Sequence, residues 1–115
     1  YHRALRAGLE EMGLSFVVPE ADPLPQLNAV RIPGGVDDAQ IRKALLDDYG
    51  LEIGAGLGAM AGKVWRIGLM GHSATARNVL YCLSALDNTL SGAGVDIERG
   101  AAVAAAMREL DERNR

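Results

Sequence analysis

Residues 64–70, Val-Trp-Arg-Ile-Gly-Leu-Met, form the most strand-like stretch of this 115-residue chain. Successive side chains of a β-strand point to opposite faces of a sheet. One predicted face is apolar and suited to packing under helices: Trp65, Ile67 and Leu69. The other face carries Val64, Arg66, Gly68 and Met70. The stretch therefore predicts a strand with one buried face and one face that presents an arginine.

Apolar residues at helical spacing and glycine or proline breaks predict the elements around this strand. The predicted helices cover residues 1–12, ended by Gly13; 37–49, capped by Asp37 or Asp38 and ended by Gly50; 73–90, capped by Ser73; and 96–110, starting at Asp96. Further short strands are predicted over residues 14–18, 28–32 and 51–53.

The predicted order of elements is α-β-β-α-β-β-α-α. It indicates an α/β (α+β) fold, a two-layer sandwich in which helices cover one face of a small, mainly antiparallel sheet. The length suits a single domain over residues 1–115. The chain starts at Tyr1, without an initiator Met and as though already inside a helix, so we expect it to be a piece of a longer polypeptide.

Composition excludes several classes of function. A net charge of −3 argues against nucleic acid or an anionic membrane surface as a partner. No apolar run reaches the ~18 residues that a membrane span needs. The single cysteine, Cys82, rules out an intrachain disulfide framework and suits a reducing cytoplasm. His2 and His72 lie far apart in sequence, so no histidine-based zinc site is expected.

The glycine-rich run before the central strand formally fits a dinucleotide fingerprint, Gly54-x-Gly56-x-x-Ala59. That motif needs a following helix whose N-terminus holds the pyrophosphate, whereas this run leads into a predicted strand. Gly62-Lys63 is followed by Val64 and not by Ser or Thr, so a Walker A loop is absent as well. We interpret the run as a tight or mobile connection.

Arg66 is the most informative single residue. A guanidinium beside Gly68 would have open space next to it, and its planar fork matches a carboxylate. The alternative is an arginine paired with a structural acid or facing water. From the pattern alone, a structural or solvated arginine is the commoner case, because most arginines lie on the surface.

The remaining chemically capable side chains are interpreted as structural. Lys43 and Lys63 are predicted to be solvated charges, because nothing indicates the desolvation that a catalytic lysine needs. Cys82 lies among leucines and is predicted to be a small core residue. His72 either enters the next helix or lines a cleft. The adjacent acids are predicted to be caps and solvated faces: Glu10-Glu11, Asp37-Asp38 and Asp47-Asp48.

Residues 56–71, Gly-Leu-Gly-Ala-Met-Ala-Gly-Lys-Val-Trp-Arg-Ile-Gly-Leu-Met-Gly, closely resemble a segment of the alanine–glyoxylate and serine–glyoxylate (serine–pyruvate) aminotransferases. These are class V, fold-type I enzymes that depend on pyridoxal 5'-phosphate. The resemblance covers about residues 1–90, and residues 91–115 look like an added C-terminal helix. The sequence departs from the family at Ala59-Met60 and at His72.

The resemblance implies a C-terminal small domain that supplies the arginine for the substrate α-carboxylate, here Arg66. It implies that the cofactor and its lysine belong to a large N-terminal domain, so this chain carries no catalytic or cofactor-binding residue of its own. The implied reaction transfers an amino group from alanine or serine to glyoxylate or pyruvate, in a homodimer. A cytoplasmic location is expected from the single cysteine and the absence of a visible targeting signal. The 115 residues alone are not expected to be active.

Three alternatives remain at this stage. Within the family, the chain could belong to a ureidoglycine–glyoxylate aminotransferase. Outside it, the chain could be a small-molecule-binding or regulatory α/β module without chemistry. A purely structural dimerisation domain, using the helix over residues 96–110, is the third.

Overall fold

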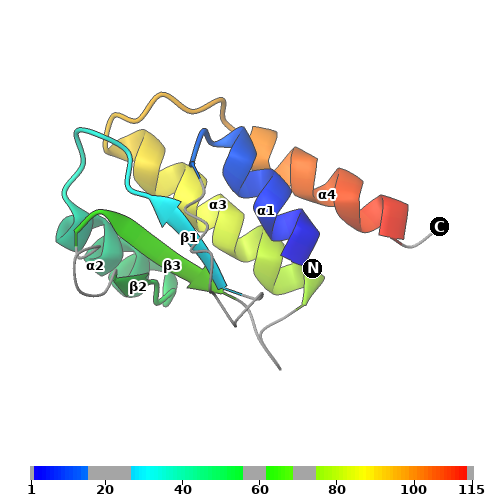
Figure 1. Cartoon of the computed structure of the whole chain (residues 1–115), viewed down its shortest axis with the longest axis horizontal. Coiled ribbons are helices and arrows are strands. Elements are labelled where there is room, and N and C mark those ends of the chain that lie inside the picture. The colour runs from blue at the N-terminus through cyan, green and yellow to red at the C-terminus, as the bar shows by residue number, and fades with distance from the viewer. Residues whose placement is uncertain (1, 16–26, 56–61, 69–74, 114–115) are drawn as a thin grey trace.

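The computed structural model describes residues 2–15, 27–55, 62–68 and 75–113. The helices are α1 (His2–Glu11), α2 (Asp38–Tyr49), α3 (Ala76–Gly92) and α4 (Ala101–Arg113). The strands are β1 (Leu27–Arg31), β2 (Gly54–Ala55) and β3 (Val64–Gly68). Figure 1 shows how these elements are arranged.

The sheet is built around β3. Its strand order is β1-β3-β2, and both neighbours run antiparallel to β3. The register pairs Val30 with Trp65 on one side and Ala55 with Trp65 on the other. The stretch singled out from the sequence is therefore the central strand, as its apolar content favours.

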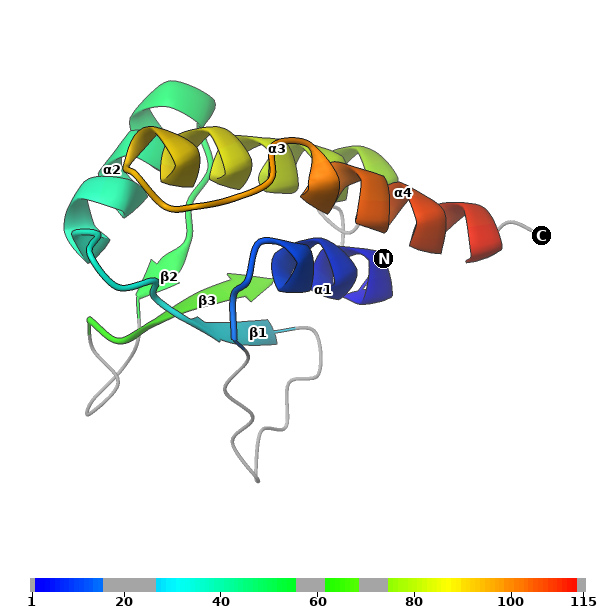
Figure 2. The same ribbon diagram turned by 90° about the horizontal axis from the view of Figure 1, so that it is seen from above.

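Helices cover one face of the sheet. Figure 2 shows the sheet on one side of the molecule and the helical layer on the other, with α4 packed against α1 and α3. Trp65 and Ile67 join the core below the helices, as strand alternation predicts, together with Val30 from β1. The expected fold class, a two-layer α/β sandwich with a small antiparallel sheet, is confirmed.

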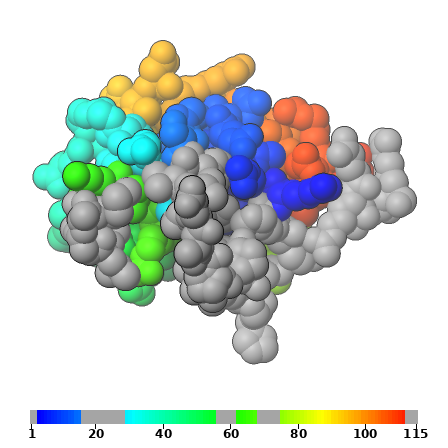
Figure 3. Space-filling model, viewed as in Figure 1, coloured from blue at the N-terminus to red at the C-terminus, as the bar shows by residue number. Residues whose placement is uncertain are grey.

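The apolar faces of α1 and α3 supply most of the helical part of the core. Leu5 and Leu9 of α1 are buried, as are Leu83, Leu86 and Leu90 of α3. Each such side chain contributes roughly 1.5–3 kcal/mol on burial. In the space-filling view, α1 lies on the surface between the segment that contains β1 and the segment that contains α4 (Figure 3).

Local signals set the bounds of α2 as the sequence predicts. The Asp37 carboxylate accepts a hydrogen bond from the Gln40 backbone N–H, which caps the start of the helix. Gly50 ends it in the left-handed conformation, at φ 65°, where a residue with a Cβ is strained. The backbone N–H of Leu51 then bonds to the Leu45 carbonyl and closes the turn.

Several element bounds differ from the sequence predictions: β1 is Leu27–Arg31 and not 28–32, and α3 and α4 end at Gly92 and Arg113 and not at 90 and 110. The short strand is Gly54–Ala55 and not 51–53, because these two residues, and not Leu51 to Ile53, reach the edge of β3. Thr75, and not Ser73, caps α3, since its hydroxyl accepts from the Asn78 N–H. The last helix begins at Ala101 and not at Asp96, because Gly100 has a positive φ of 84°. Leu14 and Ser15 are outside any strand, and the rest of the predicted strand 14–18 lies outside the described residues.

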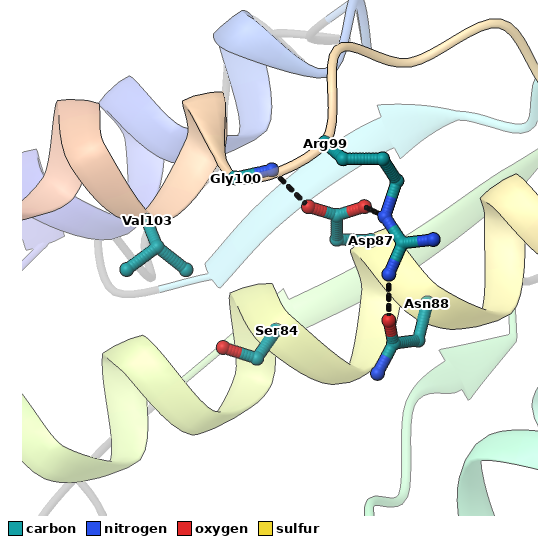
Figure 4. A pocket seen from close by; sticks show the side chains of 6 residues that line it. All are labelled: Ser84, Asp87, Asn88, Arg99, Gly100 and Val103. Carbon is teal, nitrogen blue, oxygen red and sulfur yellow. Dashed lines mark hydrogen bonds and ion pairs between the residues drawn. The ribbon is translucent and has the colours of Figure 1, made fainter.

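A buried carboxylate joins α4 to α3. Asp87 is only 5% exposed and accepts a hydrogen bond from the Gly100 backbone N–H at 2.8 Å, at the start of α4. Arg99 pairs with the same carboxylate at 2.7 Å and also donates to the Asn88 side chain (Figure 4). A carboxylate on an α-helix N-terminus satisfies free N–H groups and complements the helix dipole. Asp87 therefore works as the cap of a helix other than its own.

The close approach of α1, α3 and α4 at Gly8 yields a stability prediction. A Cβ on Gly8 would press on the methyl groups of Leu83 and lie 3.0 Å from the Ala102 carbonyl oxygen. We expect Gly8→Ala to lower the free energy of unfolding by about 1–3 kcal/mol, measured by chemical denaturation, because the crowded core must shift. Gly92→Ala is the matched control, because a Cβ there meets nothing within 4 Å, and it should stay within about 0.5 kcal/mol of the unaltered protein. Equal effects of the two variants would contradict this assignment.

Candidate functional site

Arg66 lies at the centre of the sheet, on the face opposite the buried side chains of Trp65 and Ile67. The register places Ala29 of β1 on one side of it and Gly54 of β2 on the other. Both neighbours are small. The arginine therefore stands in the middle of a three-residue row that leaves room around its long side chain.

The guanidinium lies over β2. Its Nε–H donates to the Ala55 carbonyl oxygen at 3.0 Å. An ideal Cβ on Gly54 would lie 3.4 Å from Nε and Nη2 of Arg66, so the guanidinium occupies the space that a side chain larger than a methyl group would take at position 54. Gly54 thus leaves room beside the guanidinium, a role that the sequence analysis did not give it. The open space expected beside Gly68 stays a prediction, because the surroundings of Gly68 lie outside the described residues.

Arg66 is half-buried and carries no ion pair with any carboxylate of the described residues. Among those residues, Nη1 and Nη2 donate no hydrogen bond. A half-buried charge is stable only when it is paired or solvated. Pairing with a structural acid is therefore absent among the described residues, which leaves an arginine that faces water or is available to an anion.

The strand that carries Arg66 is anchored by its neighbour Trp65. The indole is fully buried, and its Nε1–H donates to Oδ1 of Asp38 at 2.7 Å. Arg42 holds the same carboxylate through Nε at 2.9 Å and Nη2 at 3.2 Å. The hydrogen bonds from Arg42 are the main cause that lowers the pKa of Asp38 below its ordinary value of 3.8. The network ties the first turn of α2 to β3.

Other residues singled out from the sequence are structural where the structure describes them. Lys43 is exposed and pairs with Asp47 one helical turn later, while Lys63 is exposed in the turn before β3. Cys82 is buried in the core, and burial raises the pKa of its thiol to about 12, which removes its nucleophilic form. His72 and the glycine-rich residues 56–61 lie outside the described residues.

Sequence reasoning missed two carboxylates. Asp38 was predicted to be a helix cap or a solvated acid, and Asp87 was passed over. Asp38 is instead partly buried and holds Trp65 and Arg42, and Asp87 is buried and holds Arg99 and the Gly100 N–H. Asp87 did carry a signal, because it sits on the apolar stripe of α3 beside Leu83, Leu86 and Leu90. Asp38 carried none, because its partner Trp65 is 27 residues away.

The described residues also contain two open pockets away from Arg66. An open pocket on α3 is lined by Thr75, Arg77, Asn78 and Tyr81, and the pocket in Figure 4 lies between α3 and the start of α4. No cluster of metal-binding side chains occurs among the described residues. Within the same residues, none of the helices combines the length and hydrophobicity that a membrane crossing requires.

Comparison with known proteins identifies relatives. No family model matches the chain. The chain is 40% identical over 107 residues to the (S)-ureidoglycine–glyoxylate transaminase of Bacillus subtilis, 37% over 97 residues to an alanine–glyoxylate aminotransferase of Drosophila melanogaster, and 36% over 110 residues to the pyridoxamine–pyruvate transaminase of Mesorhizobium japonicum. These matches take in 93%, 84% and 95% of the chain. The chain belongs to this aminotransferase family.

The fold agrees with the sequence match. The crystal structure of ureidoglycine–glyoxylate aminotransferase from Bacillus subtilis superposes with a TM-score of 0.88, over 96% of this chain and 30% of that one, at 39% identity. The family resemblance inferred from residues 56–71 is therefore confirmed. The chain spans about a quarter of the length of these curated relatives, namely 26%, 25% and 28%.

The Asp38 network generates a pH-dependent prediction. A carboxyl whose pKa is lowered in the folded state stabilises the fold above its unfolded value of 3.8 and loses that contribution as pH falls through the folded value. Asp38→Asn keeps an acceptor for the indole but loses the charge facing Arg42. We expect the unfolding free energies of the unaltered protein and this variant to differ most above the unfolded value of 3.8 and to converge as pH falls through the lowered folded value.

Denaturant titrations across that pH range would measure the effect. Asp48→Asn, at an exposed position of the same helix, is the control and should keep the pH dependence of the unaltered protein. A gap between Asp38→Asn and the unaltered protein that widens on acidification would refute the assignment.

Proposed function

We propose that this chain is the C-terminal domain of a pyridoxal-phosphate-dependent aminotransferase that moves an amino group from alanine or serine to glyoxylate or pyruvate. Relatives named for amino-group transfer to glyoxylate or pyruvate support the reaction class. The single observation that carries the proposal is the half-buried Arg66, whose terminal nitrogens have no partner among the described residues.

In this proposal Arg66 binds the α-carboxylate shared by the amino acid and the oxo acid. A guanidinium donates two parallel hydrogen bonds to a carboxylate, which fixes both position and orientation. Holding the substrate in this way aligns its reacting carbon and so lowers the entropic part of the barrier. Arg66 is a substrate-binding residue that acts by positioning, without transferring a proton.

The described residues offer no site for the cofactor. Of the two lysines in the chain, Lys43 is exposed and paired with Asp47, and Lys63 is exposed in a turn. Neither has the desolvated surroundings that a reactive amine needs. In our proposal pyridoxal 5'-phosphate is held by an N-terminal large domain of the same enzyme, where it would supply the electron sink for amino-group transfer. A cytoplasmic homodimer is part of the same proposal.

The amino donor has a second candidate. The Bacillus subtilis relative, 40% identical over 93% of this chain, is named for ureidoglycine, and its solved structure superposes with a TM-score of 0.88. Transfer from ureidoglycine to glyoxylate is therefore the alternative within the family. Competition between alanine, serine and ureidoglycine for the same enzyme distinguishes these donors.

The internal division of the domain stays a prediction. Residues 1–90 are proposed as the family-like core and residues 91–115 as an added helix. Ala102 and Ala106 of α4 are buried in the same core as α1 and α3. Helix α4 therefore packs as part of the core and not as an appendage.

The cofactor assignment can be tested by visible spectroscopy of the full-length enzyme. We expect an absorption band of bound pyridoxal phosphate that changes on addition of L-alanine, L-serine or ureidoglycine and returns on addition of glyoxylate. An enzyme without such a band, or with a band that no amino donor changes, would contradict the proposed activity. A colourless protein that still binds small carboxylates would instead support a binding module.

The role of Arg66 can be tested by substitution in the full-length enzyme. Arg66→Ala should raise KM for both the amino donor and the oxo acid by about 10- to 100-fold, because a charged bidentate contact is lost. Arg66→Lys should recover only part of this, since a single ammonium cannot reproduce the fork. Arg108→Ala removes an exposed arginine of α4 and should leave KM unchanged. Near-normal kinetics in Arg66→Ala would refute the assignment.

A further inference from the structure

We propose that Gly54 and the backbone of Ala55 position Arg66, so that the substrate carboxylate is bound end-on through Nη1 and Nη2. This inference rests on the proposed function and goes beyond it by naming the positioning residues and the edge of the guanidinium that is used. Three observations around β2 carry it.

The first observation is the hydrogen bond from Nε to the Ala55 carbonyl oxygen, at 3.0 Å. Arginine has one N–H on Nε and two on each terminal nitrogen, and a carboxylate can be bound along either the Nε–Nη2 edge or the Nη1–Nη2 edge. The backbone carbonyl already occupies the Nε–H. The Nη1–Nη2 edge is therefore the pair of donors that remains for a bidentate contact.

The second observation is the absence of a side chain at Gly54. An ideal Cβ there would lie 3.4 Å from Cβ, Nε and Nη2 of Arg66, which is ordinary van der Waals contact. One methyl group can thus be accommodated. A β-branched residue places two more carbons beside the guanidinium and has little rotamer freedom to move them away. It would push Arg66 off the Ala55 carbonyl.

The third observation is that the acceptor belongs to the sheet. Ala55 pairs with Trp65, and Trp65 is fully buried and tied to Asp38. The carbonyl that holds Arg66 is therefore fixed to the same strand that carries Arg66. An anchor of this kind limits the side-chain entropy lost when the substrate is bound.

The test compares three variants in the full-length enzyme: Gly54→Val, Gly54→Ala and the control Gly34→Val. Gly34 follows β1, and a Cβ there meets nothing within 4 Å. The measurements are KM for the amino donor and the oxo acid, kcat, the inhibition constant of propionate as an unreactive carboxylate, and the melting temperature.

We expect Gly54→Val to raise KM and the propionate inhibition constant by about 10- to 100-fold, with a smaller effect on kcat and little change in melting temperature. Gly54→Ala and Gly34→Val should stay within about threefold of the unaltered enzyme. A general defect of folding would lower the melting temperature and the amount of active enzyme, and would leave the inhibition constant of the folded fraction unchanged.

The two proposals fail in different ways. If Arg66→Ala weakens propionate binding and Gly54→Val does not, the positioning role is wrong and the proposed function stands. If Arg66→Ala itself has no effect, the proposed function is wrong. If Gly54→Val does not fold, Gly54→Ser takes its place. A hydroxyl within reach of Nη2 can accept a hydrogen bond from it, and it should raise the inhibition constant above that of Gly54→Ala. Equal constants for Ser, Ala and the unaltered enzyme would overturn the inference.

Discussion

The burial of the Trp65 indole, with its N–H bonded to Asp38, is the constraint on which the sheet depends. A tryptophan can be fully buried at low cost only if its polar N–H finds an acceptor, and Asp38 at the start of α2 supplies one at 2.7 Å. Arg42 neutralises that carboxylate in turn. Fixing Trp65 inward also turns Arg66 to the opposite face, because neighbouring side chains of a strand alternate.

In the helical layer, too, a polar group is buried only because it has hydrogen-bond partners. Asp87 on α3 is buried, and it is acceptable there because Arg99 and the Gly100 N–H satisfy it. In both networks a carboxylate from one helix joins an element far away in sequence. Each carboxylate is more buried than the arginine that pairs with it. Removing such a partner is costly, because it leaves a shielded charge uncompensated.

On the sheet face that carries Arg66, small residues leave room for the long arginine side chain. Ala29 and Gly54 flank the arginine, and a backbone carbonyl rather than an acidic side chain holds its Nε. This holds the side chain without neutralising it, so the positive charge stays available. The chain belongs to the aminotransferase family and spans about a quarter of the length of its curated relatives. Contributing this charge to substrate binding is the role that we propose for Arg66.

The sequence by itself determined the central strand, the bounds of α2 and the face on which Arg66 lies, because alternation, capping and glycine stops are local effects. The family could be identified from residues 56–71 for the same reason, as a contiguous match. Only the tertiary structure decided that Gly54 makes room for the guanidinium, that the partly buried Asp38 binds Trp65 and Arg42, and that the buried Asp87 caps α4. These facts depend on contacts between residues distant in sequence, which no local pattern of residues encodes.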